Sequence, residues 1–313
     1  MANIMSSVTE VKTEEADEVV CASCGITEVD DIKLEECNGG CDLVKYCSDK
    51  CQENHREQHE GECNQRKAIL RDRELFEHPD GTHLGECPIC FLPLSLLPRK
   101  STFCSGCCKY ACIGCSYANF QSRGRWICPF CREPSISGKK ENYKRLMKRV
   151  KVNDPAALFE MAIRRNKEGD YNKAVEYFKE AAELGNADAH NELGNRYCIG
   201  GEGDGVEEDY EKAIRHWEKA AIGGHPKARY NLGVYEENSG NTERAVKHFM
   251  IAAKLGDEES MTMLWKFYSD GRITKEDLED TLRTHKAAID ATKNAERDAA
   301  EVWFQQLASS AQL

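Results

Sequence analysis

Residues 21–63 read CASCGITEVDDIKLEECNGGCDLVKYCSDKCQENHREQHEGEC, and residues 87–132 read CPICFLPLSLLPRKSTFCSGCCKYACIGCSYANFQSRGRWICPFCR. Together they hold sixteen of the seventeen cysteines of the chain. Two thiolates separated by two residues stand at the ends of one tight turn, so both can bind a single metal ion. Four such pairs occur: Cys21/Cys24, Cys87/Cys90, Cys112/Cys115 and Cys128/Cys131. Each pair is half of a tetrahedral zinc site, which a second pair must complete.

Disulfide bonds and packing in an apolar core are the other possible roles of these cysteines. Disulfides need an oxidising compartment, but the N-terminus (MANIMSSVTEVKTEEADEVV) has no basic start followed by an apolar run, as a secretory signal would. The cysteines also stand among Gly, Ser, Asn and Lys, which do not form a core. We therefore predict structural zinc, with about four ions per chain from the number of ligands, in an intracellular protein of the cytoplasm or nucleus.

Composition limits the other possibilities. The chain has 313 residues, which gives room for two or three domains, and 40% of them are hydrophobic. No stretch approaches the length that a bilayer crossing needs. The net charge of -11 argues against non-specific nucleic-acid binding as the main activity. Residues 87–151 are an exception, since they carry thirteen Lys/Arg and only two Glu.

The first stretch has a specific spacing, C-x2-C-x12-C-x3-C-x5-C-x3-C-x7-H-x3-C. It resembles the MYND zinc finger, and this resemblance implies docking of protein or peptide ligands, in particular short proline-containing peptides. His55 is an alternative to His59 as a ligand, but a position four residues before Cys63 points His59 the same way as that cysteine. The resemblance implies one ion on Cys21, Cys24, Cys47 and Cys51, and another on Cys37, Cys41, His59 and Cys63.

The second stretch reads C-x2-C-x13-C-x3-C-x3-C-x2-C-x12-C-x2-C if Cys108 is the fourth ligand. It resembles a RING finger, in which ligand pairs one and three hold one ion and pairs two and four hold the other. Because Cys107 and Cys108 are adjacent, the sequence does not decide which of them is the fourth ligand. The other one is expected not to bind zinc. The resemblance implies one ion on Cys87, Cys90, Cys112 and Cys115, and another on Cys104, Cys108 or Cys107, Cys128 and Cys131.

RING fingers act as ubiquitin-protein ligases by binding a ubiquitin-conjugating enzyme, and they need no catalytic nucleophile of their own. The residues at or near the family's contact positions are Ile89, Trp126, Pro129 and Arg132. An arginine at the last of these positions can donate several directed hydrogen bonds to two partners at once. The alternative is a RING-like module that only binds other proteins.

The segments around these two modules read more simply. Residues 1–20 are predicted to be a disordered acidic tail. Residues 64–86 are a charged helical linker that ends at a Pro-Asp-Gly turn. Residues 133–153 are a basic linker helix with Tyr143, Leu146, Met147 and Val150 at helical spacing. The side chains at that spacing predict a helix that packs one face on a neighbouring element. The alternative is a segment that binds an acidic partner or RNA.

From residue 154 to 270 the chain repeats itself. Small residues recur at separations of 32, 39 and 32 residues along the chain. In each repeat a large aromatic residue and then a glycine follow later in the sequence. Small residues permit close contact between helices, and glycine ends a helix in a left-handed cap. The first-helix positions are Ala157, Ala189, Ala228 and Ser260, with Met161, Leu193, Leu232 and Leu264; the second-helix positions are Ala174, Ala213 and Ala245, then Phe178, Trp217 and Phe249, then Gly185, Gly224 and Gly256.

This pattern predicts an α-solenoid of helix pairs. The longer loop of the second copy, CIGGEGDGVEEDYEKA, resembles the Sel-one-like repeat, a relative of the tetratricopeptide repeat, and only this copy shows the full motif. Such solenoids bind peptides or proteins on a concave face. Residues 271–313 are expected to be capping helices, the last at roughly 293–308 closing the end of the solenoid. Cys198 is predicted to be a packing residue, and His285 a surface or packing residue rather than a metal ligand.

The predicted fold class is therefore multidomain: two small zinc-stabilised modules followed by an all-α solenoid. Two functions fit it. The first is a ubiquitin ligase that recruits a conjugating enzyme through residues 87–132 and substrates through the other two modules. The second is a non-enzymatic adaptor for protein–protein interaction.

Overall fold

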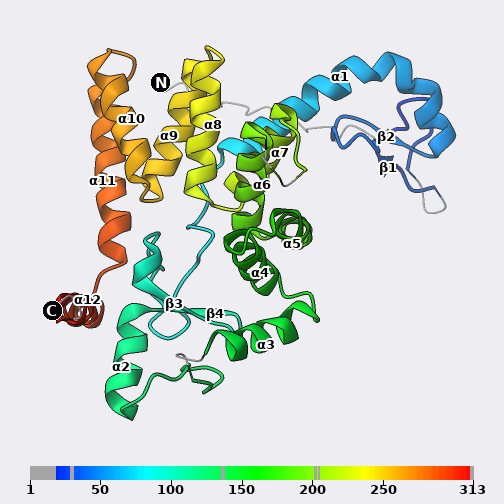
Figure 1. The fold of residues 1–313 in the computed structure, drawn as a ribbon. Coiled ribbons are helices and arrows are strands. Elements are labelled where there is room, and N and C mark those ends of the chain that lie inside the picture. Colours follow the sequence, from blue (N-terminus) through cyan, green and yellow to red (C-terminus); the bar gives the residue numbers. More distant parts are fainter. Residues whose placement is uncertain (1–18, 29–31, 135–137, 201–202, 204, 311–313) are drawn as a thin grey trace, which may run out of the picture. The chain divides into compact units, whose positions relative to one another are not determined.

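The computed structural model describes residues 19–28, 32–134, 138–200, 203 and 205–310. The predicted acidic tail lies almost wholly outside these residues. The chain divides into two compact units, Met1–Glu74 and Leu75–Leu313, and each is described here by itself (Figure 1).

The first unit is built around cysteines rather than around an apolar core. Two short strands, β1 (Glu35–Glu36) and β2 (Lys45–Tyr46), pair antiparallel, and the helix α1 (Asp49–Phe76) follows them. Four of the six buried residues in its central cluster are cysteines, so little apolar area is available to stabilise the unit. The cluster consists of Cys21, Leu34, Cys37, Cys41, Tyr46 and Cys63.

The second unit begins with a β-hairpin followed by a helix. Strands β3 (Ser101–Cys104) and β4 (Lys109–Cys112) pair antiparallel, with Ser101 opposite Cys112, and α2 (Ile113–Arg123) follows directly. The thiol of Cys112 accepts the Cys115 N–H and caps α2. Predicted ligands thus stand at the ends of both strands and at the start of the helix.

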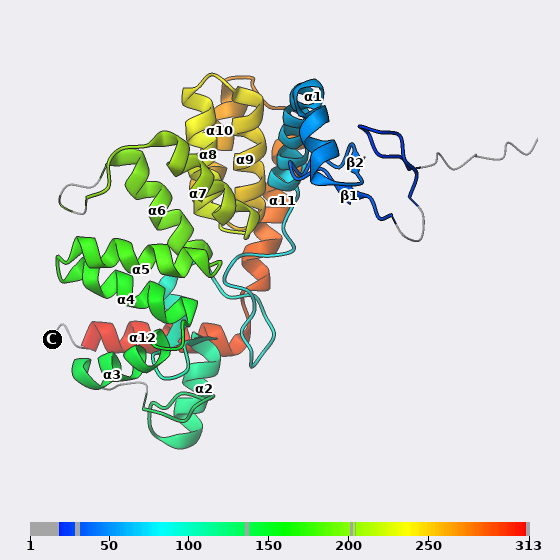
Figure 2. The same cartoon turned by 90° about the vertical axis from the view of Figure 1, so that its right-hand side faces the viewer.

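The rest of the second unit is helical, with each helix packed on the next along most of the chain (Figures 1 and 2). Most of these helices start at an Asp, Asn, His or Thr whose side chain accepts a backbone N–H of the first turn, as N-caps do. They are α3 (Lys139–Val150), α4 (Pro155–Lys167), α5 (Tyr171–Glu183), α6 (Ala187–Ile199), α7 (Tyr210–Ile222), α8 (Pro226–Asn238), α9 (Thr242–Lys254), α10 (Glu258–Ser269), α11 (Lys275–Ala291) and α12 (Ala295–Ser310).

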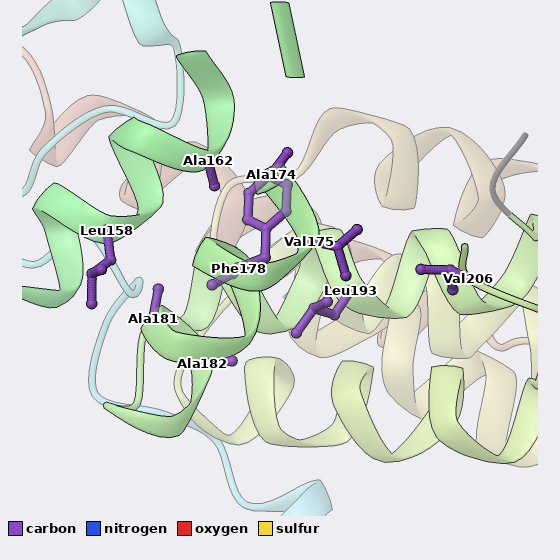
Figure 3. Packing of buried hydrophobic residues seen from close by; sticks show 10 residues of the cluster. Leu158, Ala162, Ala174, Val175, Phe178, Ala181, Ala182, Leu193 and Val206 are labelled. Carbon is purple, nitrogen blue, oxygen red and sulfur yellow. The ribbon is translucent and has the colours of Figure 1, made fainter. Parts of the chain in front are cut away.

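The structure buries the small, aliphatic and aromatic repeat positions that the sequence singled out. The small residues, the aliphatic residues and the aromatic residues at those positions are at most 4% exposed. Figure 3 shows Phe178 between Leu158, Ala174 and Leu193 in the first of these clusters. The three predicted capping glycines have φ of 81°, 79° and 98°, a conformation that glycine adopts without strain. Helix pairs α4–α5, α6–α7 and α8–α9 are the repeats.

Gly194 in α6 permits a close contact with Trp217 of α7. A Cβ at this position would lie 2.4 Å from Cδ1 of Trp217, so the indole could not keep its place. We expect Gly194→Ala to destabilise the solenoid by about 1–3 kcal/mol, the usual cost of overpacking. Thermal unfolding followed by circular dichroism measures this effect. Gly223→Ala is the matched control, because the atoms nearest to a Cβ at that position are 3.4 Å away, an ordinary van der Waals distance. An unchanged melting temperature for Gly194→Ala would contradict the prediction.

The C-terminal helices differ from the prediction in one respect. α11 begins after Thr274, whose side chain accepts the Asp277 N–H, and it packs on α9 and α10, where it covers the last repeat. α12, which we expected to close the solenoid, packs on α2 of the residue 87–132 module instead (Figures 1 and 2). The reason is its aromatic residue Trp303, whose ring lies 5.1 Å from that of Tyr117 and 5.6 Å from that of Phe120.

The two linkers are packed segments of the fold. Leu146 of α3 is buried with Ala157 and Met161, and Tyr143 and Met147 pack against the same cluster, as the helical spacing predicted. At the C-terminal end of α1, Leu75 is buried among residues of α7 and α8. Buried Arg229 donates to the backbone oxygen of Leu75 at 2.6 Å and holds this helix end in place.

Candidate metal centres

Four groups of ligands come together in the described parts of the chain, and each contains four residues. Within a group, the candidate ligand atoms all lie within 4.8 Å of one another. In both units the groups interleave along the sequence, as the two resemblances implied. The groups are Cys21, Cys24, Cys47 and Cys51; Cys37, Cys41, His59 and Cys63; Cys87, Cys90, Cys112 and Cys115; and Cys104, Cys107, Cys128 and Cys131.

The spacing of the sulfur atoms fits zinc. With Zn–S bonds of about 2.3 Å, two ligands of a tetrahedral ion are about 3.8 Å apart. The Sγ atoms of Cys24 and Cys47 are 3.6 Å apart, and those of Cys37 and Cys63 are 3.9 Å apart. None of the seventeen cysteines, which all lie in the described residues, forms a disulfide bond.

The structure places His59, and not His55, in the second group. Nε2 of His59 lies 3.1 Å from Sγ of Cys41, and the side chain is buried. Nδ1 of His55 lies 3.0 Å from the hydroxyl of Tyr46 instead. Both residues are on α1, and the four-residue spacing between His59 and Cys63 puts them on one face, as predicted.

The group at Cys87 is surrounded by hydrogen-bond donors. Sγ of Cys90 and Sγ of Cys112 are 3.8 Å apart, and the Cys112 N–H donates to Sγ of Cys87 at 3.4 Å. Burial alone would raise the pKa of the Cys90 thiol, but hydrogen bonds from the Leu92 N–H and the Arg297 guanidinium lower it to about 7. These donors favour the thiolate, which is the form that binds zinc.

The last group contains Cys107, whereas the spacing that we wrote for this stretch used Cys108. Sγ of Cys107 is 3.7 Å from Sγ of Cys128, and Cys104 is 3.5 Å from Cys131. Cys108 has a φ of 53° and packs against the buried cluster of Leu146 instead. Burial and the charge of Asp154 raise the pKa of Cys108 to about 12, which keeps it a thiol. Cys108 is therefore the spare cysteine.

The predicted contacts for a conjugating enzyme differ in their accessibility. Ile89 is 41% exposed, Arg132 is exposed, and Pro129 is half-buried. Trp126 is different, because its ring stacks on Phe120 at 4.5 Å and lies 5.8 Å from the ring of Trp303 in α12. No spacing rule in the sequence connects this residue to a helix so distant along the chain.

One further group, His83, Asp188 and His225, has ligand types that could hold a metal. Nδ1 of His225 accepts the Ala228 N–H at 3.2 Å, so the ring proton must be on Nε2, where it faces Asp188 Oδ1 at 3.5 Å. A metal at that Nε2 would need its lone pair. Burial would raise the pKa of Asp188, but hydrogen bonds from His225 and His83 hold it well below its usual range. The group is a hydrogen-bonded network that fastens His83 to the solenoid.

Two family models match the chain. The MYND finger matches residues 21–63, and the Sel1 repeat matches residues 155–186, 187–225 and 226–257. Both resemblances are thus confirmed, and the Sel1 match extends to all three repeats, whereas we expected the full motif only in the second. The chain consists of an N-terminal zinc-binding module followed by a mostly helical region with Sel1 repeats. Neither match includes residues 87–132, so the RING resemblance stays a prediction.

Solved structures with Sel1-like repeats are similar to the chain. The Sel1 repeat protein from Oxalobacter formigenes is 25% identical, over 56% of this chain and 71% of that one, with a TM-score of 0.42. The protective antigen c5321 of uropathogenic Escherichia coli, which displays an SLR fold, is 29% identical over 46% of this chain and 32% of its own, with a TM-score of 0.39. No curated protein matches the chain.

Within the described residues, no helix combines the length and the apolar character that crossing a bilayer requires.

Proposed function

We propose that this chain is a ubiquitin-protein ligase that holds about four zinc ions. In this proposal residues 87–132 recruit a ubiquitin-conjugating enzyme, and the MYND finger and the repeats bind the substrate. MYND fingers and Sel1 repeats generally mediate protein–protein interactions, which accords with the substrate-binding part. The first unit also contains a cavity of about 680 Å³, lined by Tyr46, Gln52 and Arg56 among others, which is large enough for a peptide segment.

The observation that carries the proposal is the interleaving of the two cysteine groups in residues 87–132. The first and third pairs form one group, and the second and fourth pairs form the other. This is the cross-brace that the RING resemblance implies, and it places Ile89 in a turn of one centre and Pro129 in a turn of the other. Arg132 directly follows the last ligand, with a φ of 60° that turns the chain there.

A specific observation favours the second candidate, a non-enzymatic adaptor. Trp126, one of the four predicted contacts, is packed against Trp303 and Phe304 of α12. A conjugating enzyme that needs Trp126 would have to displace this helix. In an adaptor, residues 87–132 and α12 together would form a binding platform or a structural spacer.

Ubiquitin transfer by the full chain separates the two candidates. We expect chains to form when the purified protein is mixed with activating enzyme, ubiquitin, ATP and a broad panel of conjugating enzymes. Ile89→Ala and Arg132→Ala should each reduce the rate by about tenfold or more, the usual result of losing a well-buried contact at an interface. The readout is the rate of ubiquitin discharge from the conjugating enzyme.

Arg283→Ala is the matched control, because this arginine is largely exposed on α11, with a side-chain exposure of 77%, and forms an ion pair with Asp280 on the same helix. It should leave the rate unchanged. Failure of every conjugating enzyme to form chains would leave the adaptor as the function. Activity that survives both Ile89→Ala and Arg132→Ala would show that the contact residues are wrong.

A further inference from the structure

α12 brings a buried cation to the zinc group at Cys87. Arg297, on the first turns of this helix, is only 5% exposed. Its Nη2 lies 3.3 Å from Sγ of Cys90, which is 207 residues away in the sequence. The same guanidinium donates to the backbone oxygens of Pro93 and Thr292 at 2.7 Å and of Leu92 at 3.2 Å.

Within the described residues, none of the hydrogen-bond acceptors of Arg297 is a carboxylate. Its side-chain partners are three carbonyl oxygens and one cysteine sulfur. Burial of a guanidinium is costly unless an opposite charge is close. A zinc ion with four thiolates carries a formal charge of about -2, and this is the anionic group that Arg297 faces.

The module is also shaped to accept this helix. Gly114 lies between the ligands Cys112 and Cys115, and a Cβ there would come within 2.8 Å of the Arg297 backbone nitrogen. Glycine therefore lets α12 approach the zinc loop. Two further contacts hold the helix: an ion pair between Lys100 and Glu301 at 2.5 Å, and the aromatic contacts of Trp303.

We propose that Arg297 is a positioning residue of the Cys87 centre, and that it couples zinc binding there to the docking of α12. The inference rests on the zinc content put forward under the proposed function, and it does not depend on ligase activity. Arg297 offsets the charge of the thiolates and holds the Cys90 turn through its carbonyl oxygens. Because coupling between two binding events is reciprocal, loss of this zinc ion loosens α12, and loss of Arg297 weakens the zinc site.

Zinc release from the full chain tests the coupling. The protein is mixed with a chromogenic zinc chelator, and the ions released are counted against time. We expect Arg297→Gln to release one ion per chain roughly 10–100-fold more readily than the native protein, the typical effect of losing a residue that orients a metal ligand. Arg297→Lys, which keeps the charge, should fall between the two. Arg283→Gln is the surface control and should behave as the native protein.

Hydrogen exchange measures the reciprocal effect and identifies the centre. In Arg297→Gln, we expect exchange to quicken in residues 85–93 and 112–116, while residues 21–63 keep their protection. In Cys115→Ser, which lacks a ligand of the same centre, exchange should quicken across residues 295–310. This second variant retains Arg297, so it tests the coupling even if Arg297→Gln disturbs folding.

Two results would overturn the inference. One is native zinc-release kinetics in Arg297→Gln, and the other is unchanged exchange of residues 295–310 in Cys115→Ser. A native protein that contains no zinc at residues 87–132 would overturn the zinc content of the proposed function as well. Absence of ubiquitin transfer with the zinc coupling intact would affect the ligase proposal alone.

Discussion

The Cys107→Ser protein should contain about one zinc ion fewer than the native protein, whereas Cys108→Ser should contain the native number. The two residues are neighbours, but only Cys107 has its sulfur within the group of Cys104, Cys128 and Cys131. A structural zinc site contributes about 10–16 kcal/mol of binding free energy, and a serine oxygen is a poor substitute for a thiolate. The effect is therefore large for one variant and absent for the other.

Native mass spectrometry of protein purified without chelator gives the number of ions per chain. The native protein should carry about four, as the four groups of ligands imply. Cys107→Ser should also become sensitive to proteases within residues 101–132, because the hairpin and α2 have few buried apolar residues of their own. Cys108→Ser loses only a packing contact near Leu146. Zinc loss in Cys108→Ser with retention in Cys107→Ser would show that the structure assigns the wrong cysteine.

The ligands of the first unit could be predicted because the spacing of residues 21–63 resembles that of the MYND finger, and part of that spacing has a local geometric reason. Pairs of cysteines in one turn share an ion, and His59 and Cys63 share a face of one helix. The repeats were predictable for a similar reason. Their small and aromatic residues recur at fixed spacing, so one helix pair explains the next, and all of these positions are buried.

Local geometry could not decide whether Cys107 or Cys108 is the zinc ligand. Consecutive residues of a tight turn point in different directions, and which sulfur meets Cys128 depends on the φ of 53° at Cys108. The sequence does not state this angle. The cluster formed by Leu146, Ala157 and Met161 offers Cys108 an apolar site, but those residues belong to other segments of the chain.

The contribution of α12 was also beyond sequence reasoning. Arg297 and Cys90 are 207 residues apart, and no spacing rule connects them. Two features could have raised suspicion: an unusual concentration of aromatic residues at Trp303 and Phe304 near the end of the chain, and Gly114 inside a helix start. Neither feature indicates which segment of the chain it contacts, so the packing of α12 on α2 is known only from the structure.

Acid should destabilise the solenoid, and buried His248 should account for a large part of the effect. Its side chain is fully buried, and its ring lies 4.7 Å from that of Phe76. Burial, with smaller contributions from the charges of Arg229 and Arg244, lowers the pKa of His248 to about 3 from its ordinary value of 6.5. The folded protein therefore keeps this imidazole neutral, whereas the unfolded chain takes up a proton below about pH 6.5.

This difference in pKa sets the direction in which the stability of the folded protein changes with pH. The folded pKa lies below the unfolded one, so the contribution to stability is complete above about pH 6.5 and is lost progressively as the pH falls towards 3. At pH 5 the loss from His248 alone is about 2 kcal/mol. Burial also lowers the pKa values of His190 and His216 to about 4, so both add to the loss in the same direction.

His248→Leu isolates this contribution, since leucine fills a similar volume and does not titrate. Urea unfolding, followed by circular dichroism at pH 7 and at pH 5, should show a loss of stability about 2 kcal/mol smaller in His248→Leu than in the native protein. Acid also weakens zinc binding, but it does so equally in both proteins, so the comparison removes that effect. His78→Gln is the control, because the side chain of His78 is exposed. An equal loss in His248→Leu and the native protein would mean that His248 is protonated in the folded state, and its burial beside Arg229 and Arg244 would then need another source of negative charge.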